Sequence, residues 1–243
     1  MNLAQILMAM IDRPARAMRE AAQRPRSWLL PAAFLVISMV FLAWMSAPYQ
    51  LELTNERSAQ MIERIAANMP EEQARIVRES ASEMTMNRYL MTSAGVGLIV
   101  AGLAWVVRGA LVHFSSMALG GISTWAPTFA IGVWSMLPFF VRDLVQAIYV
   151  WLKGQVLEHQ GLGFLVASGD WLKDSQSVQY ALLANIDPFA LWHLVLLATG
   201  IAVATKVSRT KATVLALVVW AVFLGLKIVP VAVTSAISPG LTG

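Results

Sequence analysis

The residue types that most often carry enzyme or metal chemistry are few in this sequence and widely spaced. The chain has 243 residues and no cysteine, so it has no thiolate nucleophile and no Cys-based metal site. Its three histidines, His113, His159 and His193, are far apart and form no His–Glu metal motif. It has no Walker-type phosphate loop and no serine nucleophile elbow. The sequence therefore predicts a protein that is not an enzyme and needs no cofactor.

Four ionisable residues lie within or beside long apolar segments, where a charge is costly and is usually retained for a purpose. They are Arg108, Arg142, Asp143 and Lys227. We expect Asp143 to pair with Lys227 and to tie the third apolar segment to the fifth. Two other interpretations stay open. Lys227 could simply extend to the outer headgroups, or the cations could line a pathway for a substrate or for protons.

Basic residues also gather before the first apolar segment and in the short turn between the fourth and the fifth. Lys and Arg in short loops hold those loops in the cytoplasm, so a pure topology signal is the favoured interpretation. The alternative is contact with anionic lipid headgroups. The candidate headgroup contacts are Arg24, Arg26, Lys206, Arg209 and Lys211.

Apolar segments position all of these charges. Hydrophobic residues make up 58% of the chain and charged residues 13%, whereas soluble domains carry about 25% charged residues. A membrane-spanning helix needs roughly 20 apolar residues. We predict an all-α fold, an integral membrane bundle of five transmembrane helices in one membrane domain over residues 1–243. The predicted spans are Trp28–Pro48, a segment that begins near Tyr89, Ser123 to Phe140 or beyond, Phe189–Thr205 and Ala212–Val233.

Two span ends are open at this stage. The second span either stops at Val107, with Arg108 at the cytoplasmic surface, or runs on to Leu119 with Arg108 at lipid depth. The apolar stretch 144–152 either continues the third helix or lies along the outer interface. The fourth span has a clear start, because Asp187 can cap its N-terminus and Pro188 suits the first helical position.

The charge distribution predicts the orientation of the chain in the plasma (inner) membrane. With the N-terminus in the cytoplasm, the inner segments hold nine basic and two acidic residues, whereas acidic residues exceed basic ones outside. Residues 1–27 then form a cytoplasmic amphipathic segment, in which Leu3–Ile11 is a short helix on the membrane surface. Five spans leave the C-terminus outside.

Two polar regions are predicted on the outer side. Residues 51–88 carry two amphipathic stripes on either side of Pro70, which predicts a helical hairpin with its apolar faces together. The alternative is one long solvated helix that bends at Pro70. Residues 153–187 are predicted to form an extracytoplasmic polar loop.

Several local sequences, taken in order, resemble a known family. They are Arg24–Pro31 before the first span, Gly120-Gly121 before the third span with its Pro138, Ile186–Trp192, Gly200–Ala202 and Lys206–Ala212. In order and spacing they resemble the bacterial branch of the Yip family, named for eukaryotic proteins that bind Rab/Ypt GTPases. The resemblance covers residues 10–233. It implies five spans, a cytoplasmic N-terminal segment and no catalytic residues. It also implies an accessory role, in some bacterial relatives beside ABC-type export systems.

The sequence thus favours a non-enzymatic accessory or scaffold subunit of a membrane complex, with an export system as one candidate complex. The expected partners are the lipid bilayer and another membrane protein or a second copy, and no nucleic acid. The alternative function is a small channel or transporter, whose polar path would be lined by Arg108, Arg142 and Lys227. Small residues on an outward face would favour the first function, and a wet central cavity would favour the second.

Overall fold

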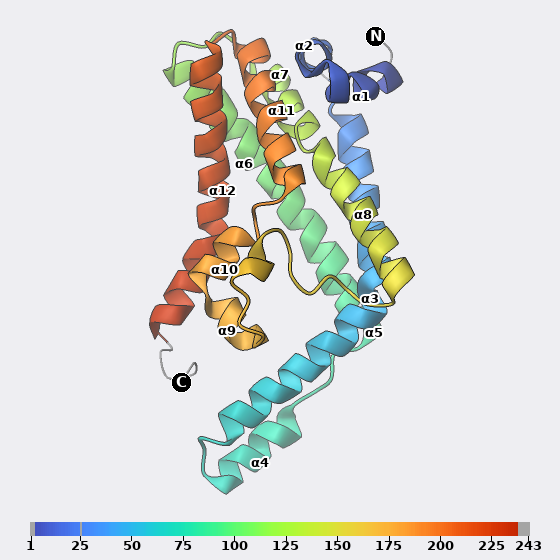
Figure 1. Cartoon of the computed structure of the whole chain (residues 1–243), viewed down its shortest axis with the longest axis vertical. Helices are drawn as coiled ribbons and strands as arrows, with labels where there is room; N and C mark the ends of the chain where they lie inside the picture. Colours follow the sequence, from blue (N-terminus) through green and yellow to red (C-terminus); the bar gives the residue numbers. More distant parts are fainter. Residues whose placement is uncertain (1–2, 25, 238–243) are drawn as a thin grey trace. The chain divides into compact units, whose positions relative to one another are not determined.

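The computed structural model describes residues 3–24 and 26–237, which are helical and contain no strand. Five helical segments are long and apolar enough to cross a membrane (Figure 1). The predicted all-α fold with five spanning helices is therefore confirmed. The spans are α3 (Leu29–Ala66), the continuous segment Met86–Ala118, the segment Trp125–Lys153, α11 (Pro188–Thr205) and the first part of α12 (Arg209–Ile237).

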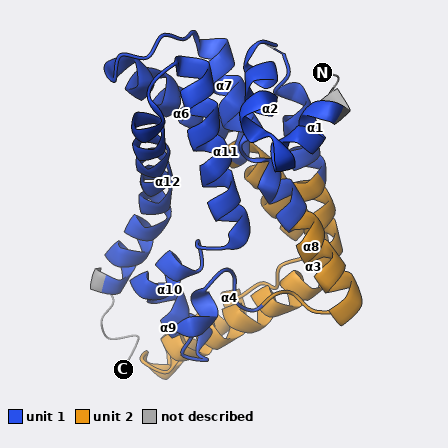
Figure 2. Ribbon diagram, turned by 45° about the horizontal axis from the view of Figure 1, so that its top comes forward, with its two compact units in different colours: residues 1–37, 101–142, 158–243 blue, residues 38–100, 143–157 orange. Residues whose placement is uncertain are grey.

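The chain divides into two compact units, coloured separately in Figure 2, and each is described by itself. Unit 1 holds the N-terminal helices, most of the spans and the chain's C-terminal part. Unit 2 holds most of α3 with the region that follows it. Unit 1 comprises residues 1–37, 101–142 and 158–243, and unit 2 comprises residues 38–100 and 143–157.

The core of unit 1 forms where α2 (Pro14–Ala22), α7 (Trp125–Trp134) and α11 pack against one another. Met18, Ile131 and Leu197 are fully buried there. Trp134 is also buried and donates from its indole nitrogen to Ser27 Oγ at 3.1 Å. This satisfied polar contact fixes the chain that leads from α2 into the first span.

The N-terminal helix α1 (Leu3–Asp12) docks on the protein. The sequence predicts a helix whose apolar face lies on the membrane surface, but Ile6 and Met10 from that face are fully buried in the core of unit 1. Among the described side chains of α1, Met8 and Ile11 are large, apolar and exposed. The predicted apolar face of α1 therefore packs in the core of unit 1, and the location of α1 at the membrane surface stays a prediction. The side chain of Leu3 and residue Pro25 lie outside the described part of the chain.

The second span takes the longer of its two predicted courses. It consists of α5 (Met86–Leu90), a π-helical turn η1 (Met91–Val96) and α6 (Gly97–Ala118). The helix ends because Gly120 adopts a φ of 84°, after which the Gly121 N–H bonds to Ser116 O at 2.8 Å. This left-handed glycine cap is a common helix end. Arg108 therefore lies about 15 Å inside the end of α6.

The third span also continues past Phe140, the nearer of its two predicted ends. Helix α7 ends at Trp134, and α8 (Leu137–Lys153) begins after a short break and includes the stretch 144–152. Pro138 is the second residue of α8. At an N-terminal position its missing N–H removes no hydrogen bond of that helix. The break therefore lies where the sequence has a proline, within one long segment.

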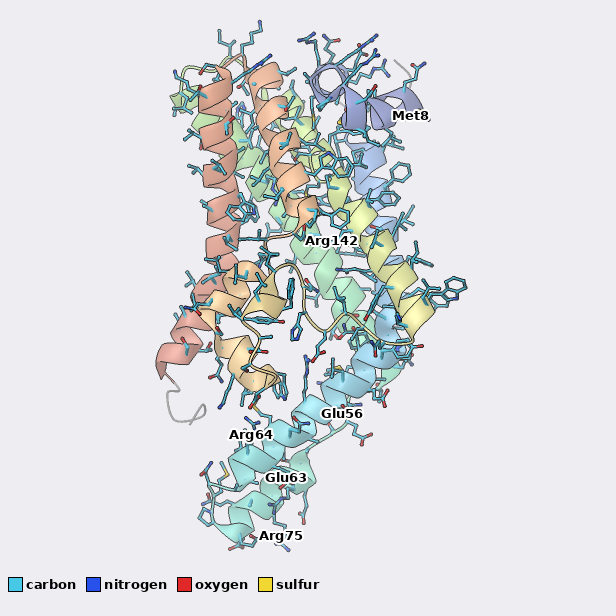
Figure 3. All side chains as sticks on the ribbon, in the orientation of Figure 1. Met8, Glu56, Glu63, Arg64, Arg75 and Arg142 are labelled. Carbon is cyan, nitrogen blue, oxygen red and sulfur yellow. The ribbon has the colours of Figure 1, made fainter. Side chains whose placement is uncertain are left out.

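The first span and the polar region beyond it form one helix, most of which belongs to unit 2. Helix α3 has 38 residues and runs through Pro48. Helix α4 (Glu71–Ser80) lies beside the end of α3, because Arg78 donates to Glu63 at 3.1 Å and Asn55 bonds to the Met84 backbone at 2.9 Å. Figure 3 shows the many charged side chains of this part, among them Glu63, Arg64 and Arg75. Its extracytoplasmic location stays a prediction.

The region predicted as a polar loop, residues 153–187, contains three short helical pieces. They are η2 (Gly163–Leu165), α9 (Trp171–Gln176) and α10 (Val178–Leu183). Helices α9 and α10 both pack against α12. Asp170 and Ser177 cap α9 and α10 by accepting backbone N–H bonds. The region is therefore ordered by local caps and by contact with a span, which its polar composition does not reveal.

Candidate functional site

The most unusual side chain of unit 1 is Arg108, which projects from α6 into the bundle. Only 9% of its surface is exposed. Its Nη1 lies 2.6 Å from Met136 Sδ, and its guanidinium carbon lies 4.5 Å from the centre of the Phe223 ring. Its Nε has no hydrogen-bond partner, and no carboxylate of the described residues forms an ion pair with it. A buried guanidinium with a sulfur and an aromatic ring for neighbours lacks its usual compensation.

His193 lies at the break between α7 and α8. It is 2% exposed, and its Nδ1 is 2.8 Å from Ser135 O. Ser135 O is available because Phe139 N–H, its partner in a regular helix, bonds to Met136 O instead. Since a carbonyl only accepts, Nδ1 carries the proton and donates. His193 is therefore a packed polar residue that joins α11 to the break.

Further polar side chains gather around the start of α11. The N-cap residue Asp187 accepts from the Ala190 N–H at 2.6 Å through Oδ1, while its Oδ2 lies 3.6 Å from Arg142 Nη1. The Arg142 guanidinium carbon also lies 4.7 Å from the centre of the Phe139 ring. The carboxylate of Asp187 therefore both caps α11 and binds a cation of α8.

Lys227 of α12 completes this group. Its Nζ donates to Asn185 Oδ1 at 2.7 Å, and the charges of Arg142, Arg108 and Asp187 all act on it. The group thus unites three cations and one carboxylate within unit 1. We call Arg108, Arg142, Asp187, His193 and Lys227 the bundle polar group. Its net positive charge could attract an anion or hold helices in register.

The predicted ion pair between Asp143 and Lys227 remains a prediction. Asp143 belongs to unit 2, where it is 6% exposed and accepts from Ser38 Oγ at 2.8 Å. Lys227 belongs to unit 1 and bonds to Asn185. The sequence did not indicate either hydrogen-bond partner, because both lie far away along the chain. It also did not indicate Asp187 as the counterion of Arg142.

The predicted headgroup contacts have different surroundings. Arg24 lies 3.6 Å from Glu20, one turn earlier, and Arg26 is exposed. Lys206 ends α11 with a φ of 60°, and Lys211 donates to Leu119 O at 2.9 Å. Arg209 lines a pocket together with arginines of α2. Two of the five residues, Lys206 and Lys211, thus also serve the turn and the helix ends, and lipid contact stays a prediction for the set.

Comparison with known proteins agrees with the architecture. The sequence profile of the Yip1 domain matches residues 8–229, which extends from α1 to α12 and includes the bundle polar group. No curated protein and no solved structure matches the chain significantly. The profile covers most of the chain, and the five apolar helices fit a multi-pass membrane protein. The chain therefore belongs to the Yip1 domain family.

Proposed function

We propose that this chain is a non-enzymatic accessory or scaffold subunit that works by packing its spans against another membrane protein. The observation that carries the proposal is the exposure of the second span. Within the most apolar part of Met86–Ala118, no residue is buried inside the chain. Large side chains such as Ile99 and Leu103 are 73% and 64% exposed. A span with so little contact inside its own chain presents its surface to lipid or to a partner.

Small residues on this span favour a protein partner over lipid alone. Added side chains at Gly95 and Gly102 would meet nothing within 4 Å. In lipid, helices associate chiefly through close van der Waals packing, for which outward-facing glycines make room. Gly95 lies within the π-helical turn Met91–Val96, a departure from regular α-helical geometry. Such turns often mark functional positions in helices. A membrane complex such as an ABC-type export system is the candidate that the Yip resemblance suggests.

The test is purification of the tagged chain from its native membrane in mild detergent, followed by mass spectrometry of the proteins that accompany it. We expect a stoichiometric membrane partner with the unchanged chain and its loss when Gly95 and Gly102 are both changed to Leu. Gly225→Leu in α12, another glycine with open space beside it, is the matched control and should retain the partner. A chain that purifies alone, or a partner retained equally by both variants, would contradict the proposal.

The bundle polar group favours one second candidate, a small channel or transporter for anions. Arg108 is buried with an unpaired Nε, and Lys227 is a further cation whose charge it influences. Ionisable residues inside spans often mark such pathways. Liposome flux assays separate the two functions. Anion flux that Arg108→Met abolishes would favour transport, whereas a purified chain that conducts nothing would favour the accessory role.

A further inference from the structure

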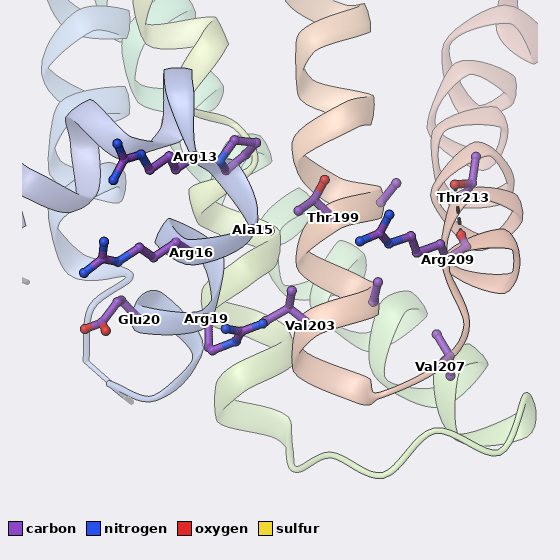
Figure 4. A pocket seen from close by; sticks show the side chains of 13 residues that line it. Arg13, Ala15, Arg16, Arg19, Glu20, Thr199, Val203, Val207, Arg209 and Thr213 are labelled. Atoms are coloured by element: carbon purple, nitrogen blue, oxygen red, sulfur yellow. Dashed lines mark hydrogen bonds between the residues drawn. The ribbon is translucent and has the colours of Figure 1, made fainter.

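A pocket of about 1150 Å³ opens in unit 1 where α2, the end of α11 and the start of α12 meet (Figure 4). Four arginines line it: Arg13, Arg16 and Arg19 come from α2 and its N-cap, and Arg209 comes from α12. The wall between them belongs to α11 and contributes small apolar and hydroxyl side chains. These are Ala198, Thr199, Ala202 and Val203.

Helix α2 is firmly packed, so the backbone positions from which its arginines project are fixed. Its opposite face buries Ala17, Met18 and Ala21 completely. Gly200 of α11 allows this close approach, because an added Cβ there would lie 3.3 Å from Met18 Sδ. The outward arginines follow a spacing of three residues, which places them along one side of the helix. The cationic wall is therefore a rigid part of the fold.

The charge of the pocket is largely uncompensated. Glu20 is the acidic residue among its lining side chains. Arg13 lies 3.4 Å from Asp12, but Arg16, Arg19 and Arg209 form no ion pair with any carboxylate in the described parts of the chain. Guanidinium groups bind phosphate oxygens through paired hydrogen bonds. The pocket thus offers several such groups to a phosphate.

The position of the pocket distinguishes a lipid from a soluble phosphate. Its α11 wall begins at Ala198, about 10 Å before the helix ends at Thr205. The ligand therefore meets arginines and small apolar side chains together along the last two turns of a membrane-spanning helix. Headgroup phosphates and the first acyl carbons lie at this level of a membrane. Anionic lipids are also attracted to basic residues at the membrane surface.

Figure 4 shows Arg19 and Arg209 reaching toward the α11 wall from its two sides, whereas Arg13 and Arg16 point away from it. We propose that this pocket binds an anionic phospholipid, with the phosphate on Arg19 and Arg209 and an acyl chain along the α11 wall. The proposal is independent of the accessory function, since it concerns lipid rather than a protein partner. It adds Arg19 to the lipid-contacting residues that the sequence suggests, and it gives Arg209 a specific role.

The test is native mass spectrometry of the delipidated full-length chain in detergent, titrated with phosphatidylglycerol or with phosphatidylcholine. We expect the unchanged chain to retain phosphatidylglycerol at least about tenfold more tightly than phosphatidylcholine. The Arg19→Gln, Arg209→Gln double variant should lose most of this preference. The matched control is Arg26→Gln with Lys206→Gln, which removes the same charge from basic residues outside the pocket and should keep it. The single variants Arg19→Gln and Arg209→Gln each test one wall if the double variant does not fold.

Three results would overturn the proposal. Equal losses in the pocket variant and the control would indicate diffuse attraction to basic residues rather than a site. No preference for phosphatidylglycerol in the unchanged chain would exclude an anionic lipid. Displacement of bound lipid by millimolar inorganic phosphate would indicate a soluble phosphate ligand. Retention of phosphatidylglycerol by the control, its loss from the pocket variant and indifference to free phosphate together support the site.

Discussion

Arg142 Nη1 lies 3.6 Å from Asp187 Oδ2, so the residue that caps α11 is also the counterion of a cation on α8. The side chains of Arg142 and Asp187 are 32% and 13% exposed, so the ion pair is only partly buried. The cap depends on backbone geometry within a few residues, whereas the pair depends on how two spans pack. Substitutions can therefore separate the two contributions.

Asp187→Asn should keep the cap and lose the pair, because an amide oxygen still accepts the Ala190 N–H. Asp187→Ala should lose both and be less stable than the Asn variant by about 1 kcal/mol. The free energy of unfolding in detergent measures the difference. In an Arg142→Gln background, Asp187→Asn should have little further effect. Equal losses for Asn and Ala would show that the cap contributes nothing.

Arg108→Met should leave the stability of the fold unchanged or raise it by about 1 kcal/mol or more. The reason is that Arg108 is buried without a carboxylate and with an unpaired Nε, whereas a methionine fills similar space. Arg108→Ala should lower the free energy of unfolding by about 2 kcal/mol or more relative to the unchanged chain, because it removes the packing against Met136 and Phe223. Thermal unfolding of both variants checks this. A Met variant as unstable as the Ala variant would show that the charge itself stabilises the bundle.

His193→Phe should destabilise the chain by about 1–3 kcal/mol, because it leaves the buried Ser135 carbonyl without its donor. His113→Phe is the control. The Nδ1 of His113 lies 3.3 Å from Thr128 Oγ1, which already bonds to the carbonyl of Trp125 at 2.8 Å. The His113→Phe control should therefore lower the free energy of unfolding clearly less. Chemical unfolding in detergent compares the two, and equal costs would argue against a special role for the Ser135 contact.

Gly200→Ala should loosen the docking of α2. The added Cβ would lie 3.1 Å from Ile131 Cβ and 3.3 Å from Met18 Sδ, and such overpacking costs about 1–3 kcal/mol. Gly132→Ala in α7 meets nothing within 4 Å and should gain up to about 1 kcal/mol from better helix propensity. Hydrogen exchange of α2 and the unfolding free energy measure both effects. A stable, well-protected Gly200→Ala variant would refute the close approach.

The predicted orientation can be tested directly because the chain has no cysteine and gives no labelling background. Glu72→Cys in α4 and Ser208→Cys in the basic turn both replace exposed residues. An impermeant maleimide should label the Glu72→Cys variant on intact cells, because the excess of basic residues holds the turn inside. The Ser208→Cys variant should react only after permeabilisation. The reverse pattern would show that the N-terminus is outside.

The sequence alone was sufficient for features that depend on neighbours along the chain. Five apolar segments predict five spanning helices, and Asp187 with Pro188 predicts the start of α11, which begins at Pro188. A cap and a span depend on backbone hydrogen bonds and lipid transfer, both of which are set within one helix.

Features that depend on contacts between helices needed the tertiary structure. The packing of α1 and α2 placed Ile6 and Met10 in the core, although their pattern alone equally suits a membrane surface. The packing of α6 put Arg108 inside the bundle, and the meeting of α2, α11 and α12 gathered distant arginines around one pocket. Local pattern shows which side of a helix is apolar. Only the packed arrangement of several helices decides what each side meets.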